Sequence, residues 1–185
     1  MITKDKLRKK FLLLRKKKYF EVNPNIFNPL LNYIKKKYKK KNQIILCLYY
    51  PVNYEFNILK IFKNIKFSKI ITLLPVIKKK NNMKFLKWKN KDILKMNKFG
   101  ILEPLSSNKS LLPDIILVPL LAYDDFKSRL GYGKGYYDKL LGQYIKQNKE
   151  VETIGIGFSF QKYHKLPSKK HDIGLDKIFT EKGLK

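Results

Sequence analysis

Short apolar runs alternate with amphipathic stretches along most of this chain, and this alternation restricts the fold more than any other feature. The clearest run, residues 114–118 (DIILV), has the length and the β-branched content of a buried strand. Strands separated by helices form βαβ units, which build a mostly parallel sheet with helices on both faces. The sequence therefore predicts an α/β fold with three layers, in which an open, mostly parallel sheet lies between helices. Further strands are predicted at residues 44–50, 69–74, 153–158 and, at the sheet edge, 83–88, and helices at 4–20, 30–40, 55–63 and 136–149.

A single domain spanning residues 1–185 is expected, because one domain usually contains roughly 100–200 residues. No internal repeat or low-complexity linker marks a boundary. Apolar residues make up 44% of the chain, which is enough to build a core. Pro51 and Pro75 are expected to end the strands before them. Residues 102–104 are expected to form an extended turn, because the residue before a proline avoids the helical conformation.

The formal net charge of +28 first suggests a protein that binds nucleic acid. Only three of the 42 basic residues are arginines, namely Arg8, Arg15 and Arg129. Arginine makes the planar, bidentate contacts that suit phosphate and guanine, so the lysine excess is interpreted as a solvated surface that reflects A/T-rich codons. Such a surface attracts polyanions weakly and in a salt-dependent way. A small RNA-binding protein is the alternative from another class, because Tyr and Lys are interleaved along the chain.

The single cysteine, Cys47, lies in an apolar run and is interpreted as a small buried hydrophobe, so no disulfide within the chain is expected. No run approaches the ~18 consecutive apolar residues that a membrane span requires. The apolar run at residues 11–14 is too short for a signal peptide. We therefore expect a cytoplasmic protein without a membrane partner.

The segment at residues 129–138 (RLGYGKGYYD) is the strongest functional motif. Its alternating glycines, Gly131, Gly133 and Gly135, permit positive φ angles and let an anion approach the backbone closely. A predicted helix follows, and its N-terminus favours negative charge. The motif comes after the strand at residues 114–118, and ligands of open α/β sheets bind beyond the carboxyl ends of the strands.

Charged side chains of the same segment fit a polyphosphate. Arg129 and Lys134 are cations, and the carboxylate of Asp138 can hold a phosphate-bound Mg²⁺. The alternative is a flexible glycine turn with Tyr136 and Tyr137 packed in the core. The segment is neither a Walker A loop, which needs Ser or Thr after Gly-Lys, nor a dinucleotide fingerprint.

Residues 118–124 (VPLLAYD) followed by residues 129–138 closely resemble the signature of the 5-formyltetrahydrofolate cyclo-ligase family. Weaker matches follow the family's order over nearly the whole chain. This resemblance implies an enzyme that couples ATP hydrolysis and Mg²⁺ to conversion of 5-formyltetrahydrofolate into 5,10-methenyltetrahydrofolate. The weaker matches are KDKLR at residues 4–8 with Arg15, Glu55, Glu103 with Pro104, GIGF at 155–158 with Gln161, Leu166 with Pro167, His171 with Asp172, and Thr180 with Glu181.

The resemblance also implies roles for individual residues. Asp138 and Asp172 would hold the metal, and Tyr50 and Glu55 would contact the folate, with or without a polyglutamate tail. The turn YPVNY before Glu55 departs from the shorter side chains of the family. We expect the enzyme to act as a monomer. The residues implied in ATP binding are Lys4, Arg8, Arg129, Leu130, Gly131, Tyr132, Gly133, Lys134, Gly135, Tyr136 and Tyr137, of which Arg129 and Lys134 are also implied in catalysis.

The implied chemistry is phosphoryl transfer to the formyl oxygen, followed by attack of nitrogen-10 on the activated carbon. Such a reaction needs positioning and charge neutralisation rather than a Ser or Cys nucleophile. Lys134 would stabilise charge on the transferred phosphoryl group, and Glu55 would accept hydrogen bonds from pterin N–H groups. An ATP-dependent enzyme with another substrate is a second alternative, because fold does not fix function.

Simpler roles remain open for several of these residues. Glu55, Asp138 and Asp172 each fit a carboxylate at a helix start or turn. His171 fits a surface turn better than a catalytic role. Trp88 fits either the core or the wall of a folate pocket, and the sequence does not decide between them.

Overall fold

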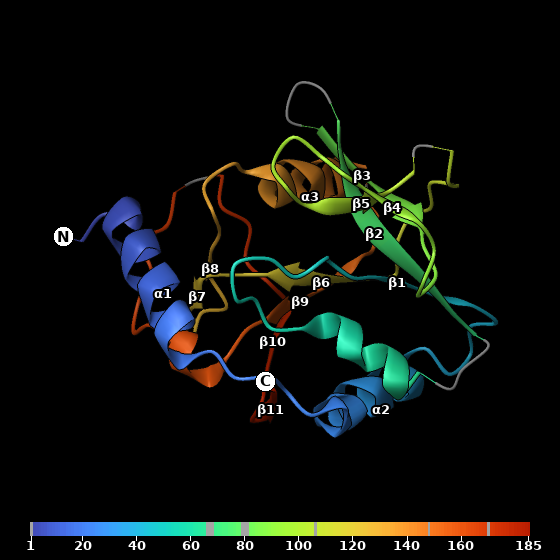
Figure 1. Cartoon of the computed structure of the whole chain (residues 1–185), viewed down its shortest axis with the longest axis horizontal. Helices are drawn as coiled ribbons and strands as arrows, with labels where there is room; N and C mark the ends of the chain where they lie inside the picture. The colour runs from blue at the N-terminus through green and yellow to red at the C-terminus, as the bar shows by residue number, and fades with distance from the viewer. Residues whose placement is uncertain (1, 66–68, 79–81, 106, 148, 170) are drawn as a thin grey trace.

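The computed structural model describes residues 2–65, 69–78, 82–105, 107–147, 149–169 and 171–185. Within these residues, a sheet of seven strands runs through the centre of the molecule (Figure 1). In spatial order its strands are β11 (Gly183–Leu184), β10 (Lys177–Thr180), β9 (Glu152–Ile156), β6 (Ile115–Pro119), β1 (Ile44–Cys47), β2 (Ile70–Lys78) and β3 (Asn82–Lys87). The inner strands are parallel, and the edge strands β3 and β11 are antiparallel to their neighbours.

Helices cover both faces of this sheet, which confirms the prediction of a three-layer α/β fold (Figure 1). On one face lie α2 (Asn28–Lys37) and the 3₁₀ helix η2 (Ile58–Lys63), and on the other lies α3 (Tyr136–Lys146). Successive residues of a strand point to opposite faces. Leu117 of β6 accordingly packs in the α2 layer, whereas Val118 packs in the α3 layer.

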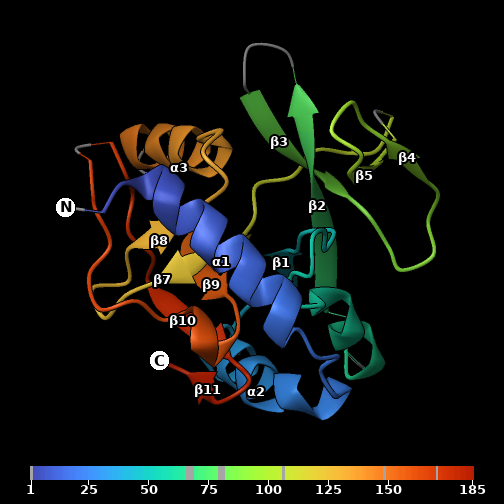
Figure 2. The same cartoon turned by 60° about the vertical axis from the view of Figure 1, so that its left-hand side comes forward.

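Helix α1 (Lys4–Lys18) belongs to neither layer. Leu7 and Phe11, spaced four residues apart, form one apolar cluster with residues of β7 (Ala122–Tyr123) and β8 (Arg129–Leu130). These two short strands form a hairpin just beyond the carboxyl end of β6. In Figure 2, α1 lies in front of this hairpin. The helix therefore packs over the sheet edge at which ligands of such folds bind.

Most predicted elements are present, with ends that differ by a few residues. The helix predicted at residues 55–63 is wrong in type and start, because only η2 forms there. The turn predicted at residues 102–104 is strand β5 (Leu102–Pro104), which pairs with β4 (Leu94–Met96). The other predicted elements differ at their ends: α1 ends at Lys18, α2 spans Asn28–Lys37, β1 ends at Cys47 before reaching Pro51, β2 spans Ile70–Lys78, β3 spans Asn82–Lys87, β6 spans Ile115–Pro119, α3 ends at Lys146, and β9 spans Glu152–Ile156. Strands β4, β7, β8, β10 and β11 and the 3₁₀ helices η1 (Pro24–Phe27) and η3 (Ser159–Gln161) were not predicted.

The prediction that Pro75 ends its strand is wrong. Strand β1 ends opposite Leu73, so beyond that residue β2 pairs only with β3. Two residues after Pro75, Ile77 donates its N–H to the carboxylate of Glu103 at 3.3 Å. Backbone direction repeats every two residues in a strand, so the nitrogen of Pro75 faces the same side, away from β3. The missing N–H therefore removes no hydrogen bond from the β2–β3 ladder.

Cys47 is fully buried, and burial raises the pKa of its thiol well above the ordinary value. This confirms the interpretation of Cys47 as a small core residue. None of the helices in the described part of the chain is long and apolar enough to cross a membrane.

Gly155 of β9 has no room for a side chain. An added Cβ would lie 2.5 Å from Cδ1 of Leu175, 2.8 Å from Cδ2 of Leu120 and 2.9 Å from Cδ1 of Ile178. We expect Gly155→Ala to lower the free energy of unfolding by about 1–3 kcal/mol through overpacking, as measured by urea denaturation. Gly174→Ala is the matched control, because its nearest atom would be 3.9 Å away. Equal stability of the two variants would contradict this account.

Candidate active site

A cleft of about 1410 Å³ opens beyond the carboxyl ends of the parallel strands. Its walls come from α1, the segment after β1, the glycine-rich segment at residues 129–138, residues 167–172 and the loop at residues 97–101. Every site residue predicted from the sequence lines this cleft, although the role of each stays a prediction. They are Lys4, Arg8, Tyr50, Glu55, Arg129, Leu130, Gly131, Tyr132, Gly133, Lys134, Gly135, Tyr136, Tyr137, Asp138 and Asp172.

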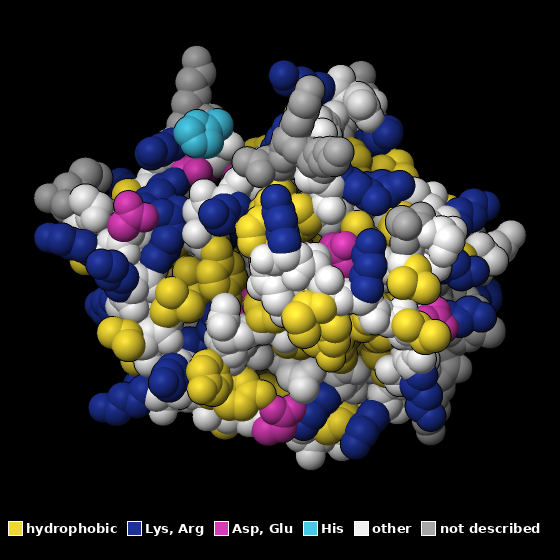
Figure 3. Space-filling view, turned by 45° about the horizontal axis from the view of Figure 1, so that its top comes forward, with side chains coloured by type: hydrophobic (Ala, Val, Ile, Leu, Met, Phe, Trp, Pro, Cys, Tyr) yellow, Lys and Arg dark blue, Asp and Glu magenta, His cyan; other side chains and the backbone are white. Residues whose placement is uncertain are grey.

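Positive charge predominates on the surface. On the face shown in Figure 3, many Lys and Arg side chains are spread among hydrophobic ones, whereas Asp and Glu side chains are few. This agrees with the formal charge of +28. A field of this sign raises the local concentration of anionic substrates.

Helix α1 holds the backbone of the glycine-rich segment in place. Nε of Arg8 donates a hydrogen bond to the carbonyl oxygen of Gly131 at 2.9 Å. Gly133 has a φ of +96°, and an added Cβ there would lie 3.0 Å from Cζ of Arg8. Gly135 has a φ of +68° at the N-cap of α3. The positive φ angles favour glycine at residues 133 and 135, and at residue 133 the side chain of Arg8 also leaves little room for a Cβ, whereas Gly131 does not use a positive φ.

The N-terminus of α3 is open toward a ligand. Its N-cap, Gly135, supplies no side-chain hydrogen bond to the N–H groups of the first turn. Unsatisfied N–H groups at a helix start bind anions. Beside them Lys134 is exposed, and its Nζ lies 6.0 Å from the ring centroid of Phe99. The ring of Tyr136 lies 6.4 Å from that of Phe99.

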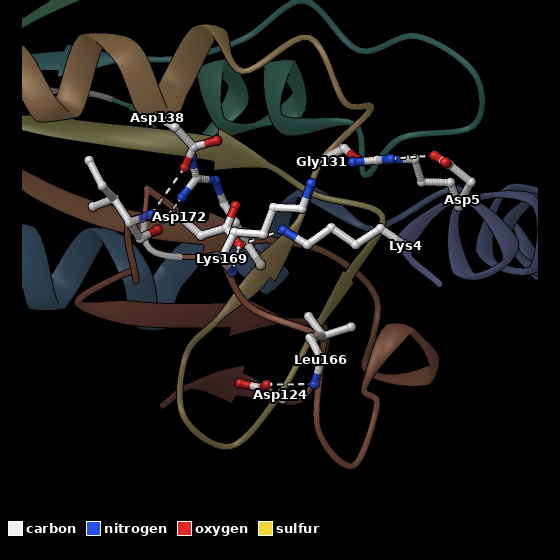
Figure 4. A network of polar contacts seen from close by, with 11 residues as sticks. Lys4, Asp5, Asp124, Gly131, Asp138, Leu166, Lys169 and Asp172 are labelled. Atoms are coloured by element: carbon white, nitrogen blue, oxygen red, sulfur yellow. Dashed lines mark hydrogen bonds and ion pairs between the residues drawn. The ribbon is translucent and has the colours of Figure 1, made fainter. Parts of the chain in front are cut away.

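Asp138, in the first turn of α3, is held by two neighbours (Figure 4). Its Oδ1 accepts a hydrogen bond from Nη2 of Arg129 at 2.8 Å and from the N–H of Ile173 at 3.1 Å. Arg129 also donates to the carbonyl oxygen of Ile173, and its side chain is only 5% exposed. Through these bonds the guanidinium of Arg129 links the β7–β8 hairpin to α3 and to the backbone of Ile173.

Asp172 is paired with Lys4, which extends across the cleft from α1 (Figure 4). The carboxylate also accepts the N–H of Lys169 at 2.6 Å. Partial burial favours a higher pKa, but the hydrogen bonds from Lys4 and Lys169 outweigh it and hold the pKa of Asp172 below its ordinary value. Asp172 is therefore ionised at neutral pH.

Asp138 and Asp172 fit a phosphate-bound ion better than a protein metal cage. The described residues include no cluster of three or more His, Cys, Asp or Glu side chains that is able to hold a metal ion. Mg²⁺ commonly uses only one or two carboxylates together with substrate phosphates and water. Two aspartates would be enough by this criterion, and their joint role stays a prediction.

Glu55 lies on the other side of the cleft and is only 5% exposed. It accepts hydrogen bonds from the N–H of Val52 at 3.0 Å and from the hydroxyl of Tyr132 at 2.9 Å. Burial raises the pKa of Glu55, and the charge of Arg15 together with these two hydrogen bonds opposes that rise. The preceding Tyr54 has a φ of +61°, a conformation that disfavours side chains and marks a constrained turn.

Tyr50 is partly buried three residues after the end of β1 and packs against the core. It lines the cleft and also a second hollow of about 590 Å³ behind it. Glu55 lines both spaces as well. The turn that carries the two predicted folate contacts therefore borders both hollows.

The structure decides the role of Trp88, which the sequence left open, and only locates His171. Trp88 is only 3% exposed, packs against Phe62 and does not line the cleft, so it is a core residue. His171 is exposed and lines the cleft beside Asp172.

Sequence reasoning missed Phe99, which lines the cleft, and gave no role to Arg15, which it named only as part of the family resemblance. Phe99 comes from the β4–β5 hairpin, whose short strands give little periodic signal. Arg15 is 1% exposed and continues the buried stripe of Leu7 and Phe11. An arginine at an apolar helical position was the available signal, since a buried charge needs partners.

Comparisons with known proteins point in one direction. A model of the 5-formyltetrahydrofolate cyclo-ligase family matches residues 2–181. A protein from Haemophilus influenzae named 5-formyltetrahydrofolate cyclo-ligase is 30% identical over 156 residues, covering 81% of this chain and 80% of that protein. One of the same name from Mycoplasma genitalium is 31% identical over 183 residues, covering 96% and 98%. The solution structure of Aquifex aeolicus 5,10-methenyltetrahydrofolate synthetase is similar with a TM-score of 0.74 and 29% identity, covering 99% of this chain and 92% of that one.

Proposed function

The chain belongs to the 5-formyltetrahydrofolate cyclo-ligase family, and we propose that it uses ATP and Mg²⁺ to convert 5-formyltetrahydrofolate into 5,10-methenyltetrahydrofolate. The observation that carries this proposal is the joint lining of one cleft by an anion-binding loop and a buried carboxylate. The loop provides Gly133, Lys134 and the open N-terminus of α3, and the carboxylate is Glu55. Such a cleft suits a nucleotide at one end and a pterin ring at the other.

The proposed reaction has two bond-forming steps. First the formyl oxygen attacks the γ-phosphorus of ATP, ADP leaves, and an imidate phosphate forms. Nitrogen-10 of the folate then attacks the activated carbon and releases its proton to solvent. The C–O bond breaks, phosphate leaves, and the five-membered ring is closed. Positioning and charge neutralisation supply the catalysis. This explains why the site needs no Ser or Cys nucleophile.

Residues of this chain divide these tasks. The N–H groups at the start of α3 bind phosphate oxygens, and Arg8 keeps the loop backbone in a binding conformation. Lys134 neutralises charge that develops on the transferred phosphoryl group. Glu55, ionised, accepts hydrogen bonds from pterin N–H groups, and Tyr50 lies against the folate. Arg129 orients Asp138 toward the nucleotide.

Mg²⁺ would be held by Asp138 and Asp172 together with the ATP phosphates. When bound, the ion neutralises phosphate charge. Lys4 is the partner of Asp172 and lies within reach of the same phosphates. The two carboxylates thus set the orientation of the nucleotide in the cleft.

Several wider properties follow as part of the same proposal. The enzyme acts in the cytoplasm as a monomer built from one domain, residues 1–185. The lysine-rich surface would assist binding of a polyglutamate tail on the substrate, which is anionic.

The test is the near-ultraviolet absorbance of the methenyl product, measured with 5-formyltetrahydrofolate, Mg²⁺ and ATP. Asp138→Asn keeps an oxygen acceptor for Arg129 but removes the charge, so we expect the rate to fall at least about tenfold. Asp125→Asn is the matched control, because Asp125 is exposed, pairs with Lys162 and lies outside the cleft.

Absorbance that needs ATP and falls only in Asp138→Asn would support the proposal. A flat trace from folded protein that binds ATP would sink the folate assignment and favour an ATP-dependent enzyme with another substrate. Binding of RNA that falls steeply with salt, without turnover, would favour the alternative from the other class.

A further inference from the structure

Tyr132 joins the two halves of the cleft. Its backbone lies in the glycine-rich segment between Gly131, which Arg8 holds, and Gly133. Its hydroxyl donates a hydrogen bond to Oε1 of Glu55 at 2.9 Å. One residue of the phosphate-binding loop therefore contacts, through its side chain, the carboxylate on the opposite wall.

A third residue, Arg15 of α1, is bonded to the same hydroxyl. Its Nη2 donates to the Tyr132 oxygen, and its guanidinium carbon lies 5.5 Å from the Tyr132 ring centroid. Nη1 donates to the carbonyl oxygen of Leu120 at 3.4 Å. Among the described residues, Nε of Arg15 is buried without a hydrogen-bond partner. A buried guanidinium with so little hydrogen bonding depends on a nearby carboxylate for compensation.

Glu55 supplies that compensation. The charge of Arg15 lowers the pKa of Glu55 against the effect of burial. Tyr49 and Tyr137 also face Glu55, but burial raises the pKa of both hydroxyls well above their ordinary value, so they remain neutral. Among the described groups that act on Glu55, Arg15 is the cation whose charge favours the ionised carboxylate and opposes the rise of its pKa on burial.

We propose, on the basis of the function proposed above, that Arg15 and Tyr132 are positioning residues that couple nucleotide binding at the glycine-rich segment to folate binding at Glu55. Phosphate binding orders the segment and fixes the Tyr132 hydroxyl. That hydroxyl and Arg15 fix the direction and ionisation of Glu55, which binds the pterin. Because coupling of two binding equilibria is reciprocal, bound folate strengthens nucleotide binding by the same factor.

Calorimetric titration of 5-formyltetrahydrofolate, with and without a saturating ATP analogue with a β,γ-methylene bridge and Mg²⁺, measures this coupling. We expect the analogue to tighten folate binding by wild-type protein at least about fivefold. In Tyr132→Phe the ring remains but the hydroxyl is lost, so the ratio of the two affinities should fall below about twofold. Tyr163→Phe is the control, since Tyr163 packs against Phe11 of α1 outside the cleft, and it should keep the wild-type ratio.

The pH dependence provides a readout that a purely structural role would not change. Folate affinity should fall as pH drops through the pKa of Glu55, and this fall forms the acid limb of the plot of folate affinity against pH. Loss of the Tyr132 hydroxyl or of the Arg15 charge raises that pKa, so the acid limb should move to higher pH in Tyr132→Phe and in Arg15→Met. Arg15→Lys keeps a positive charge and should restore the limb toward the wild-type position.

The outcomes separate this inference from the function on which it rests. Wild-type protein that binds no folate would overturn both. Wild-type protein that binds folate and nucleotide independently, or a Tyr132→Phe variant with an unchanged ratio and acid limb, would overturn the coupling and leave the enzyme assignment standing.

Discussion

Replacing Lys134 with alanine should slow formation of the methenyl product by about 10²–10³-fold at saturating substrates, the usual effect of removing one group that stabilises transition-state charge. Lys4 and Arg129 are each paired with an aspartate. Lys134, in contrast, forms no ion pair within the described residues, and its ammonium group lies 6.0 Å from the Phe99 ring centroid. Its ammonium group is therefore the cation of the loop that remains available to the phosphoryl group.

The reduction should appear in kcat, because the charge matters most when the phosphoryl group is in transfer. Steady-state rates at varied ATP and folate concentrations measure it. Lys134→Arg should recover part of the activity, and Lys9→Ala, on the exposed face of α1, controls for the change in net charge. A higher KM for ATP with an unchanged kcat would contradict the catalytic role and leave Lys134 only a binding residue.

The architecture was predictable where a periodic signal extended over several residues. Leu30, Leu31 and Ile34 recur at helical spacing and form the buried face of α2. The apolar run at residues 114–118 likewise overlaps β6, which spans Ile115–Pro119. The hairpin of β7 and β8 was not predictable, because strands of two residues carry no alternation. Its position depends on α1, which packs on it from far away in the sequence.

The residues of the candidate site were easier to predict than their contacts. The anion-binding backbone could be predicted because the alternating glycines and the start of the following helix are adjacent in the sequence. The sequence did not show that Arg129 is tied to Asp138, or that Tyr132 turns toward Glu55. Those contacts join residues on separate elements, and only tertiary packing determines them. The contact of the buried Arg15 with Tyr132 could not be predicted for the same reason.

Truncating Phe158 to alanine should lower the free energy of unfolding by about 3–5 kcal/mol, as for other large rings removed from a core. Phe158 is fully buried just after β9. Its ring centroid lies 4.9 Å from those of Phe20 and Phe56 and 5.1 Å from that of Phe160. This cluster joins the segment after α1, the turn beside Glu55 and the end of β9. Removal of the Phe158 ring would leave a cavity, and these three segments around the site would lose the side chain that all of them contact.

Urea denaturation measures the effect, and Phe126→Ala is the matched control. The Phe126 side chain is 71% exposed, so its loss should change stability by less than about 0.5 kcal/mol. Because Phe56 directly follows Glu55, Phe158→Ala should also weaken folate binding at temperatures where the variant is still folded, while the binding of nucleotide alone changes less. A variant as stable as Phe126→Ala would contradict the central place of this ring. Weakened nucleotide binding with normal folate binding would mean that the cluster supports the glycine-rich segment instead of the Glu55 turn.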